Sequence, residues 1–212
     1  MFRLVVLMPT LRWKIVHGYY IIILNFMFQE MNLVFAIMIH YSNLNGLQSQ
    51  SIGTSAMAKA KSDSSGAIAP PPLIALALVA LGVALGVLWP VELIPAPWQY
   101  IAGGVIIAAS LLLVASAFRL FRRARTPVPT YRTPTALVTD GVYTLTRNPI
   151  YLSMMLLMIG LAVTLDNIWL LALAAIFQQI IRWGVIAREE RYLGAKFGQD
   201  YRAFKQRTRR WI

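Results

Sequence analysis

The sequence predicts an all-α integral membrane protein, a helical bundle of four core transmembrane helices followed by an amphipathic C-terminal helix at the cytoplasmic surface. Hydrophobic residues make up 58% of the 212-residue chain and charged residues only 13%, a balance typical of membrane proteins. Four apolar runs of membrane-helix character are separated by turn signals. Basic residues gather beside these runs, as they do near membrane surfaces.

Residues 1–56 differ in composition from the rest of the chain. They contain two alanines and four asparagines, whereas residues 57–212 contain 23 alanines and two asparagines. We therefore expect 1–56 to be an atypical N-terminal extension and Met57 to be the biological start of a membrane domain, 57–212. Polar side chains interrupt the apolar run 19–39, which leaves open whether the extension adds one extra membrane helix.

The first two expected spans cover residues 73–89 and 98–118. The first lies between a run of three prolines and Pro90, and it carries the spacing Gly82-xxx-Gly86, which lets helix backbones approach closely. In the second span, the pair Gly103-Gly104 is another candidate for close packing.

The third expected span begins at Pro149 or Ile150 and ends at Leu165, and the fourth runs from Ile168 towards Ala187. Because only Asp166-Asn167 separates them, we expect an antiparallel helical hairpin.

After the fourth span, apolar residues recur at helical spacing among basic residues, which predicts an amphipathic tail suited to a membrane surface. Gly198 is expected to break or kink it. The members of this apolar stripe are Leu193, Phe197, Tyr201 and Phe204.

The basic residues predict the orientation. The loop 119–148 contains six Lys or Arg residues and the tail from Arg188 contains eight, whereas the turns 90–97 and 166–167 contain none. The positive-inside rule places the loop and the tail in the cytoplasm. We expect an integral protein of a bacterial inner membrane whose site faces the cytoplasm.

Composition also excludes several kinds of site. The chain has no cysteine, so disulfides and thiolate chemistry are excluded. Its two histidines, His17 and His40, both lie in the extension, so no metal is expected. The net charge of +12 lies beside apolar segments, which favours anionic lipid over nucleic acid as the partner.

Polar residues on the fourth span point to a site. At about 100° per residue, Gln178, Arg182 and Glu189 share one helix face, with Glu190 beside it. Charge at membrane depth is costly and usually faces a protein interior, where it marks function. The alternative is a buried ion pair that only joins helices. Arg182 and Glu189 are about 10 Å apart along the helix axis, which argues against a direct bond between them.

The loop before the third span leads into it through Asn148-Pro149. Asn suits a helix cap and Pro suits the first turn, and the helix N-terminus presents free N–H groups. Arg147 adds a donor fork for a carboxylate, and Tyr151 is placed to lie against an aromatic ring or a ribose. An ordinary capped helix explains the same spacing equally well.

These segments resemble the isoprenylcysteine carboxyl methyltransferase family and, more loosely, the phospholipid methyltransferases. The match covers roughly 131–211. Val142 stands where the family has Pro, Thr144 where it has Arg, and Asn148 where many members have His. The resemblance is carried by Gly141-Val-Tyr-Thr-Leu-Thr-Arg-Asn-Pro-Ile-Tyr151, Arg188-Glu-Glu-Arg-Tyr-Leu193, Phe197-Gly-Gln-Asp-Tyr201 and Arg209-Arg-Trp211.

The resemblance implies a membrane methyltransferase that binds S-adenosylmethionine at the cytoplasmic face, without a Rossmann domain, and a lipophilic acceptor that enters from the bilayer. It places the cofactor site within 131–211. The cofactor-binding residues it implies are Gly141, Tyr143, Arg147, Asn148, Pro149, Tyr151, Glu189 and Glu190.

Methyl transfer from a sulfonium needs alignment in a dry pocket, without a metal or a covalent nucleophile. A carboxylate acceptor of the isoprenylcysteine type needs a cation. The family's catalytic Arg corresponds to Val185 here, so Arg182 or Arg188 is the expected substitute. A lipid amine or a thiol would instead need a base, which Glu190 can supply.

Two other functions remain compatible with the sequence. One is an NADPH-dependent enzyme resembling the sterol reductases, which share a related membrane core. The other is a non-enzymatic membrane scaffold whose basic tail contacts lipid. Cofactor titration separates the three.

Overall fold

A computed structural model of the chain describes residues 70–91, 94, 97–128 and 134–212, all within one compact unit, 57–212. The described residues form helices and no strand. The extension 1–56 and the expected start at Met57 lie outside the described residues. The elements in order are α3 (Pro71–Leu88), α4 (Trp98–Arg123), η1 (Gly141–Thr144), α5 (Pro149–Thr164), α6 (Ile168–Ile181), η2 (Arg182–Ile186) and α7 (Ala187–Arg207).

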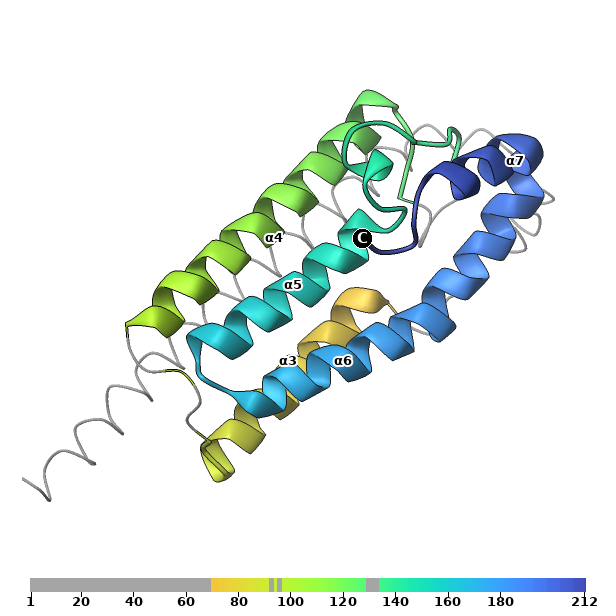
Figure 1. Cartoon of the computed structure of the whole chain (residues 1–212). Helices are drawn as coiled ribbons and strands as arrows, with labels where there is room; N and C mark the ends of the chain where they lie inside the picture. Colours follow the sequence, from red (N-terminus) through yellow and green to blue (C-terminus); the bar gives the residue numbers. More distant parts are fainter. Residues whose placement is uncertain (1–69, 92–93, 95–96, 129–133) are drawn as a thin grey trace, which may run out of the picture. The chain divides into compact units, whose positions relative to one another are not determined.

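The helices pack in sequence-distant pairs (Figure 1). Helix α4 lies along α5, α3 lies along α6, and α5 contacts α6. The connections near Ile94 and Asp166 meet at one end, where the Ile94 amide donates to Asp166 Oδ1 at 3.1 Å. The loop 134–148 and α7 lie at the opposite end of α5 (Figure 1).

Three described helices are long and apolar enough to cross a membrane: α3, α4 and the continuous helix Ile168–Arg207. Helix α5 has the predicted bounds within a residue, but it contains only 16 residues, fewer than the roughly 20 that a bilayer core usually needs. The predicted third span is therefore present as a shorter apolar helix, and its crossing of the bilayer stays a prediction.

Small residues bring α3 against the start of α6, as the Gly82-xxx-Gly86 spacing predicts. A Cβ at Gly82 would lie 2.8 Å from Leu170 Cγ, and one at Gly86 would collide with the Asn167 amide. Asn167 Nδ2 donates to the Gly82 carbonyl at 2.9 Å, and Asn167 Oδ1 caps α6 by accepting from the Leu170 amide at 3.1 Å. One buried side chain thus sets both the turn and the interhelical contact.

Helices α4 and α5 also meet at glycines. A Cβ at Gly103 would collide with Thr164 and lie 2.8 Å from the Gly160 carbonyl oxygen, whereas one at Gly104 would meet nothing within 4 Å. Of the predicted pair, Gly103 therefore makes the close contact and Gly104 does not.

The helix that carries the acidic pair is not a uniform α-helix. Residues Arg182–Ile186 form a π-helical segment, which holds more residues per turn than an α-helix. The constant step of about 100° per residue used to place Arg182 and Glu189 on one face does not hold across this segment.

Beyond the π segment, α7 reverses at Gly198, where φ is 52° and ψ is −115°, as the sequence predicts. The reversal brings Tyr201 and Phe204 into a buried cluster with Phe121 and Tyr143. The apolar stripe that the sequence assigns to a membrane surface therefore packs on the protein itself, because the turn at Gly198 folds it inward.

Candidate functional site

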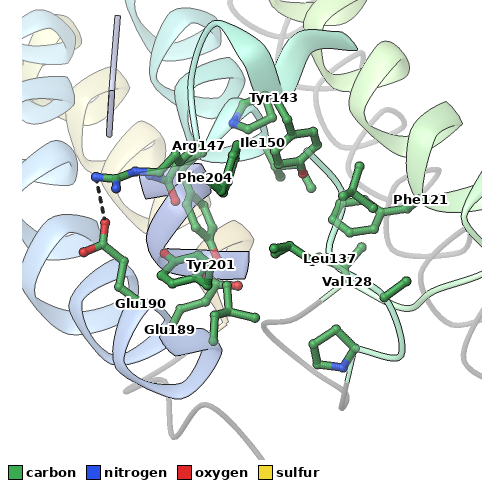
Figure 2. Close-up of a pocket in the computed structure, with 17 residues that line it drawn as sticks. Phe121, Val128, Leu137, Tyr143, Arg147, Ile150, Glu189, Glu190, Tyr201 and Phe204 are labelled. Atoms are coloured by element: carbon green, nitrogen blue, oxygen red, sulfur yellow. Dashed lines mark hydrogen bonds and ion pairs between the residues drawn. The ribbon is translucent and has the colours of Figure 1, made fainter. Parts of the chain in front are cut away.

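A cavity of about 670 Å³, including space open to solvent, lies between α7 and the start of α5. Figure 2 shows Arg147 and Glu190 on one side of it and Phe121 and Val128 on the other, so the hollow has a charged wall and an apolar wall. Its lining comprises Phe121, Val128, Pro134, Ala136, Leu137, Val138, Tyr143, Arg147, Asn148, Pro149, Ile150, Tyr151, Glu189, Glu190, Leu193, Tyr201 and Phe204.

The structure brings together the two segments that the sequence analysis singled out, although about forty residues separate them. Gly141, Arg182 and Arg188 are not among the residues that line the cavity. The predicted site residues that do line it are Tyr143, Arg147, Asn148, Pro149, Tyr151, Glu189 and Glu190.

Glu189 and Tyr151 form a buried pair across the cavity wall. The Tyr151 hydroxyl donates to Glu189 Oε2 at 3.0 Å, and the two residues are 5% and 7% exposed, Tyr151 first. Burying a carboxylate is costly unless hydrogen bonds compensate it. Tyr151 therefore both stabilises and orients the Glu189 carboxylate.

The Glu190 carboxylate forms ion pairs with three cationic side chains. Arg210 approaches it as a fork, with Nε 3.0 Å from Oε1 and Nη2 2.7 Å from Oε2. Arg147 Nη2 lies 3.3 Å from Oε1, and Lys205 Nζ lies 3.5 Å from Oε2. The hydrogen bond to Glu190 raises the pKa of Arg210, and partial burial offsets only part of that shift.

Arg147 keeps one donor without a hydrogen-bond partner among the described residues. Its side chain is only 9% exposed, its Nη1 donates to the Lys205 carbonyl at 3.3 Å, and its Nε is buried and unsatisfied. Arg147 lines the cavity, and a buried donor that lacks a partner is unfavourable.

The residues before α5 bind the C-terminal segment, defined here as residues 208–212. The Arg147 amide donates to the Arg209 carbonyl at 2.9 Å. The Arg210 carbonyl accepts from Thr146 Oγ1 at 3.1 Å and from Asn148 Nδ2 at 2.9 Å. The segment is thereby fixed against the charged wall.

The prediction that the Asn148 side chain caps α5 is wrong. The helix does begin at Pro149 as expected, but it has no side-chain cap bond at Asn148. The side-chain Nδ2 of Asn148 instead donates to the Arg210 carbonyl at 2.9 Å.

Tyr143 forms part of the cavity lining behind Glu189. It packs edge-on against Phe121, with ring centroids 5.7 Å apart. Burial, with a smaller contribution from the Glu189 charge, raises the pKa of Tyr143 well above 10.0, so the hydroxyl stays protonated at neutral pH. Gly141, at φ 57°, supplies the turn into η1 that presents Tyr143, rather than a contact of its own with the cavity.

The two arginines predicted to hold an acceptor lie away from the cavity lining. Arg182 begins the π segment and stacks on the Trp183 ring, with Cζ 5.0 Å from its centroid. Its Nε is buried without a hydrogen-bond partner among the described residues. Arg188 is half-buried. The extra residue of the π segment explains why spacing alone misplaced Arg182 relative to the acidic pair.

Sequence reasoning missed Arg210 and Lys205, which complete the charged wall. The Arg209-Arg-Trp211 ending belongs to the pattern quoted above, but spacing gave no partner for it. The pairing of Arg210 with Glu190 depends on the reversal at Gly198. No group of three or more His, Asp or Glu side chains suited to a metal occurs in the part of the chain that the structure describes.

Comparisons with known proteins indicate the family. Residues 98–200, from α4 into α7, match the family described as phospholipid methyltransferase, which contains the isoprenylcysteine carboxyl methyltransferases. An uncharacterized protein of Haemophilus influenzae is 42% identical over 62 residues, which cover 29% of this chain and 98% of that relative. No solved structure matches the chain.

Proposed function

We propose that this chain, a member of the phospholipid methyltransferase family, transfers a methyl group from S-adenosylmethionine to a small lipophilic acceptor at the cytoplasmic face of the membrane. Family membership indicates a membrane methyltransferase. The identity of the methyl donor, the class of acceptor and the roles of individual residues are our proposals.

The observation that carries the proposal is the cavity with two carboxylates on one side and an apolar wall on the other. S-adenosylmethionine combines cationic groups and ribose hydroxyls with a carboxylate and a flat adenine ring. Carboxylates, an arginine and aromatic rings are all present to receive these groups.

Glu189 is the side chain best prepared to accept hydrogen bonds from ribose hydroxyls or to face a cationic group. Tyr151 holds it in place before any ligand arrives, and such preorganisation avoids a cost of rearrangement on binding. The guanidinium of Arg147, a residue that lines the cavity, suits the carboxylate of the methyl donor. When bound, S-adenosylmethionine supplies an electrophilic methyl group.

The apolar wall suits the adenine ring or a lipophilic acceptor and limits the access of water. Phe121, Leu137 and Val138 belong to it. A dry pocket strengthens the electrostatic interactions within it.

The surroundings of Glu190 favour an acceptor that does not need a proton removed. Both oxygens of Glu190 already interact with cations, and hydrogen bonds to a carboxylate lower its proton affinity. We therefore assign Glu190 to ordering the charged wall rather than to general-base catalysis. A carboxylate acceptor of the isoprenylcysteine type fits this arrangement better than a lipid amine or a thiol.

Arg182 and Arg188 keep their proposed role of holding the acceptor carboxylate only if the acceptor reaches beyond the cavity lining. Their positions outside the lining make Arg147 the alternative cation for this role.

A titration of the purified protein in lipid nanodiscs tests the proposal. S-adenosylhomocysteine should raise the thermal unfolding midpoint, because a ligand that binds only the folded state stabilises it, and NADPH should not. Stabilisation by NADPH alone would support a reductase, and a response to neither would support a scaffold. A radiolabelled methyl transfer assay on membrane extracts would then identify the acceptor by product mass.

Glu189→Gln gives a second arm of this experiment. It should weaken the affinity for S-adenosylhomocysteine by roughly tenfold or more, since hydrogen bonds to charged groups contribute about 1.5–3 kcal/mol. Asp200→Asn is the matched control, because Asp200 is an exposed acidic residue of α7. Equal affinities for Glu189→Gln and wild type would exclude Glu189 from the site.

A further inference from the structure

We propose that Arg210 is a positioning residue of the methyl-donor site, which orders the charged wall by fixing Glu190 and tying the C-terminal segment to the loop before α5. This inference rests on the proposed function. It adds a residue that neither the acidic pair nor the Arg147–Asn148 segment would indicate.

The side chain of Arg210 binds one wall of the cavity. Its guanidinium contacts both oxygens of Glu190, at 3.0 Å and 2.7 Å, across 20 residues of sequence. A two-point contact of this kind fixes the orientation of a carboxylate as well as its position. Glu190 therefore cannot rotate freely towards its other cations.

The main chain of Arg210 binds the loop before α5. Its carbonyl oxygen accepts hydrogen bonds from Thr146 and Asn148, across 64 and 62 residues. Asn148 lines the cavity, and the Thr146 side-chain oxygen also accepts from the backbone N–H of Asn148 at 3.2 Å. One residue thus connects α7 to the start of α5 through both its side chain and its backbone.

The charges around Glu190 explain why this connection matters for a ligand. If Arg210 is removed, the carboxylate retains Arg147 at 3.3 Å and Lys205 at 3.5 Å. Without Arg210, the carboxylate is expected to draw the Arg147 guanidinium into a closer pair. Arg147 lines the cavity, so its displacement would move the guanidinium proposed to receive the ligand carboxylate.

The test measures S-adenosylhomocysteine binding to the full chain in nanodiscs by calorimetry. Arg210→Ala should weaken the affinity by roughly tenfold, because a hydrogen bond between charged groups that is lost on displacement of Arg147 corresponds to about tenfold or more in a binding constant. Arg210→Lys keeps the charge without the fork and should lie between Arg210→Ala and wild type. Arg207→Ala, which removes an exposed arginine from the same region, should bind as wild type does.

Coupling to Glu190 separates positioning from a general structural role. In a Glu190→Gln background, Arg210→Ala should weaken binding by less than about threefold, because contacting residues that act together are not additive. A wild-type affinity for Arg210→Ala, or the same loss with and without Glu190, would overturn the inference. If Arg210→Ala does not fold, Arg210→Lys takes its place in both comparisons.

The proposed function can fail separately. If the wild-type chain does not bind S-adenosylhomocysteine, the methyl-donor site itself is refuted. If the wild type binds and Arg210 variants bind equally well, only the role of Arg210 is refuted.

Discussion

Glu189 and Glu190 are neighbours in sequence but lie in different electrostatic environments. Glu189 is buried and accepts from the neutral hydroxyl of Tyr151, whereas Glu190 is surrounded by Arg147, Lys205 and Arg210. The two carboxylates thus differ in their neighbours, which is the basis for proposing a binding role for Glu189 and an ordering role for Glu190.

Glu190→Gln should lower the stability of the ligand-free protein by roughly 1–3 kcal/mol, because charged hydrogen-bonding groups in a buried wall lose their partner. Thermal unfolding in detergent would measure this as a lower midpoint. Asp200→Asn removes an exposed charge from the same helix and should leave the midpoint within error. An unchanged midpoint for Glu190→Gln would show that the contacts between Glu190 and the three cations do not stabilise the folded protein.

For individual residues, the sequence predicted which side chains line the cavity better than it predicted their hydrogen-bond and ion-pair partners. The proximity of Tyr151 to the acidic pair followed from the family resemblance. The Asn148 side chain was assigned a local role as an acceptor at the start of α5, whereas its Nδ2 donates to the distant Arg210 carbonyl, a partner that sequence spacing does not reveal. Arg210 had no assigned partner for the same reason.

The elements follow from the sequence more closely than the contacts between them. Apolar runs and proline positions predicted α3, α5 and the start of α6 to within about two residues, which is the usual uncertainty of helix ends. The π segment at 182–186 was not predicted, since no local residue pattern requires it.

The contact between α4 and α5 gives a matched pair of substitutions. Gly103→Ala should destabilise the protein by roughly 1–3 kcal/mol, as overpacking usually does, because its Cβ would meet the backbone of α5. A Cβ at the next residue, Gly104, would meet nothing within 4 Å. Gly104→Ala should therefore leave the free energy of unfolding unchanged or raise it by about 0.5–1 kcal/mol. Comparable thermal midpoints for the two variants would contradict the helix packing described here.

The reversal in α7 gives another pair. Gly198→Ala should destabilise the fold by about 1–3 kcal/mol through backbone strain alone, because φ is 52° and no heavy atom lies within 4 Å of a Cβ there. Gly194→Ala, in the regular part of α7, would meet only Tyr201 at an ordinary 3.8 Å. The control should unfold at or above the wild-type midpoint, and an equal midpoint for Gly198→Ala would refute the reversed backbone.

For the molecule as a whole, the structure places the base-rich loop and tail at one end of the described helices and the base-free turns at the other. The bond between Ile94 and Asp166 and the bonds of residues 146–148 to the C-terminal segment fix these two ends. The charge pattern predicted the same grouping. The side of the membrane that each end faces stays a prediction.

Cysteine labelling would test both the sidedness and the crossing of α5. The chain contains no cysteine, so a single introduced cysteine is labelled without background from native thiols. Leu145→Cys and Arg202→Cys should react with an impermeant maleimide from the cytoplasmic side, and Val91→Cys and Ile168→Cys from the other side. Reaction of Leu145→Cys and Ile168→Cys from the same side would show that α5 does not cross.

The π segment has a consequence for how this site could change over time. A π turn holds one more residue than an α turn, so deleting one residue between Arg182 and Ile186 would allow the helix to become regular while the acidic pair keeps its direction. Deleting one residue from the regular helix α6 would instead rotate the acidic pair by about 100° relative to the residues before the deletion. Homologous chains that are one residue shorter at the π segment should therefore still present both carboxylates to the hollow.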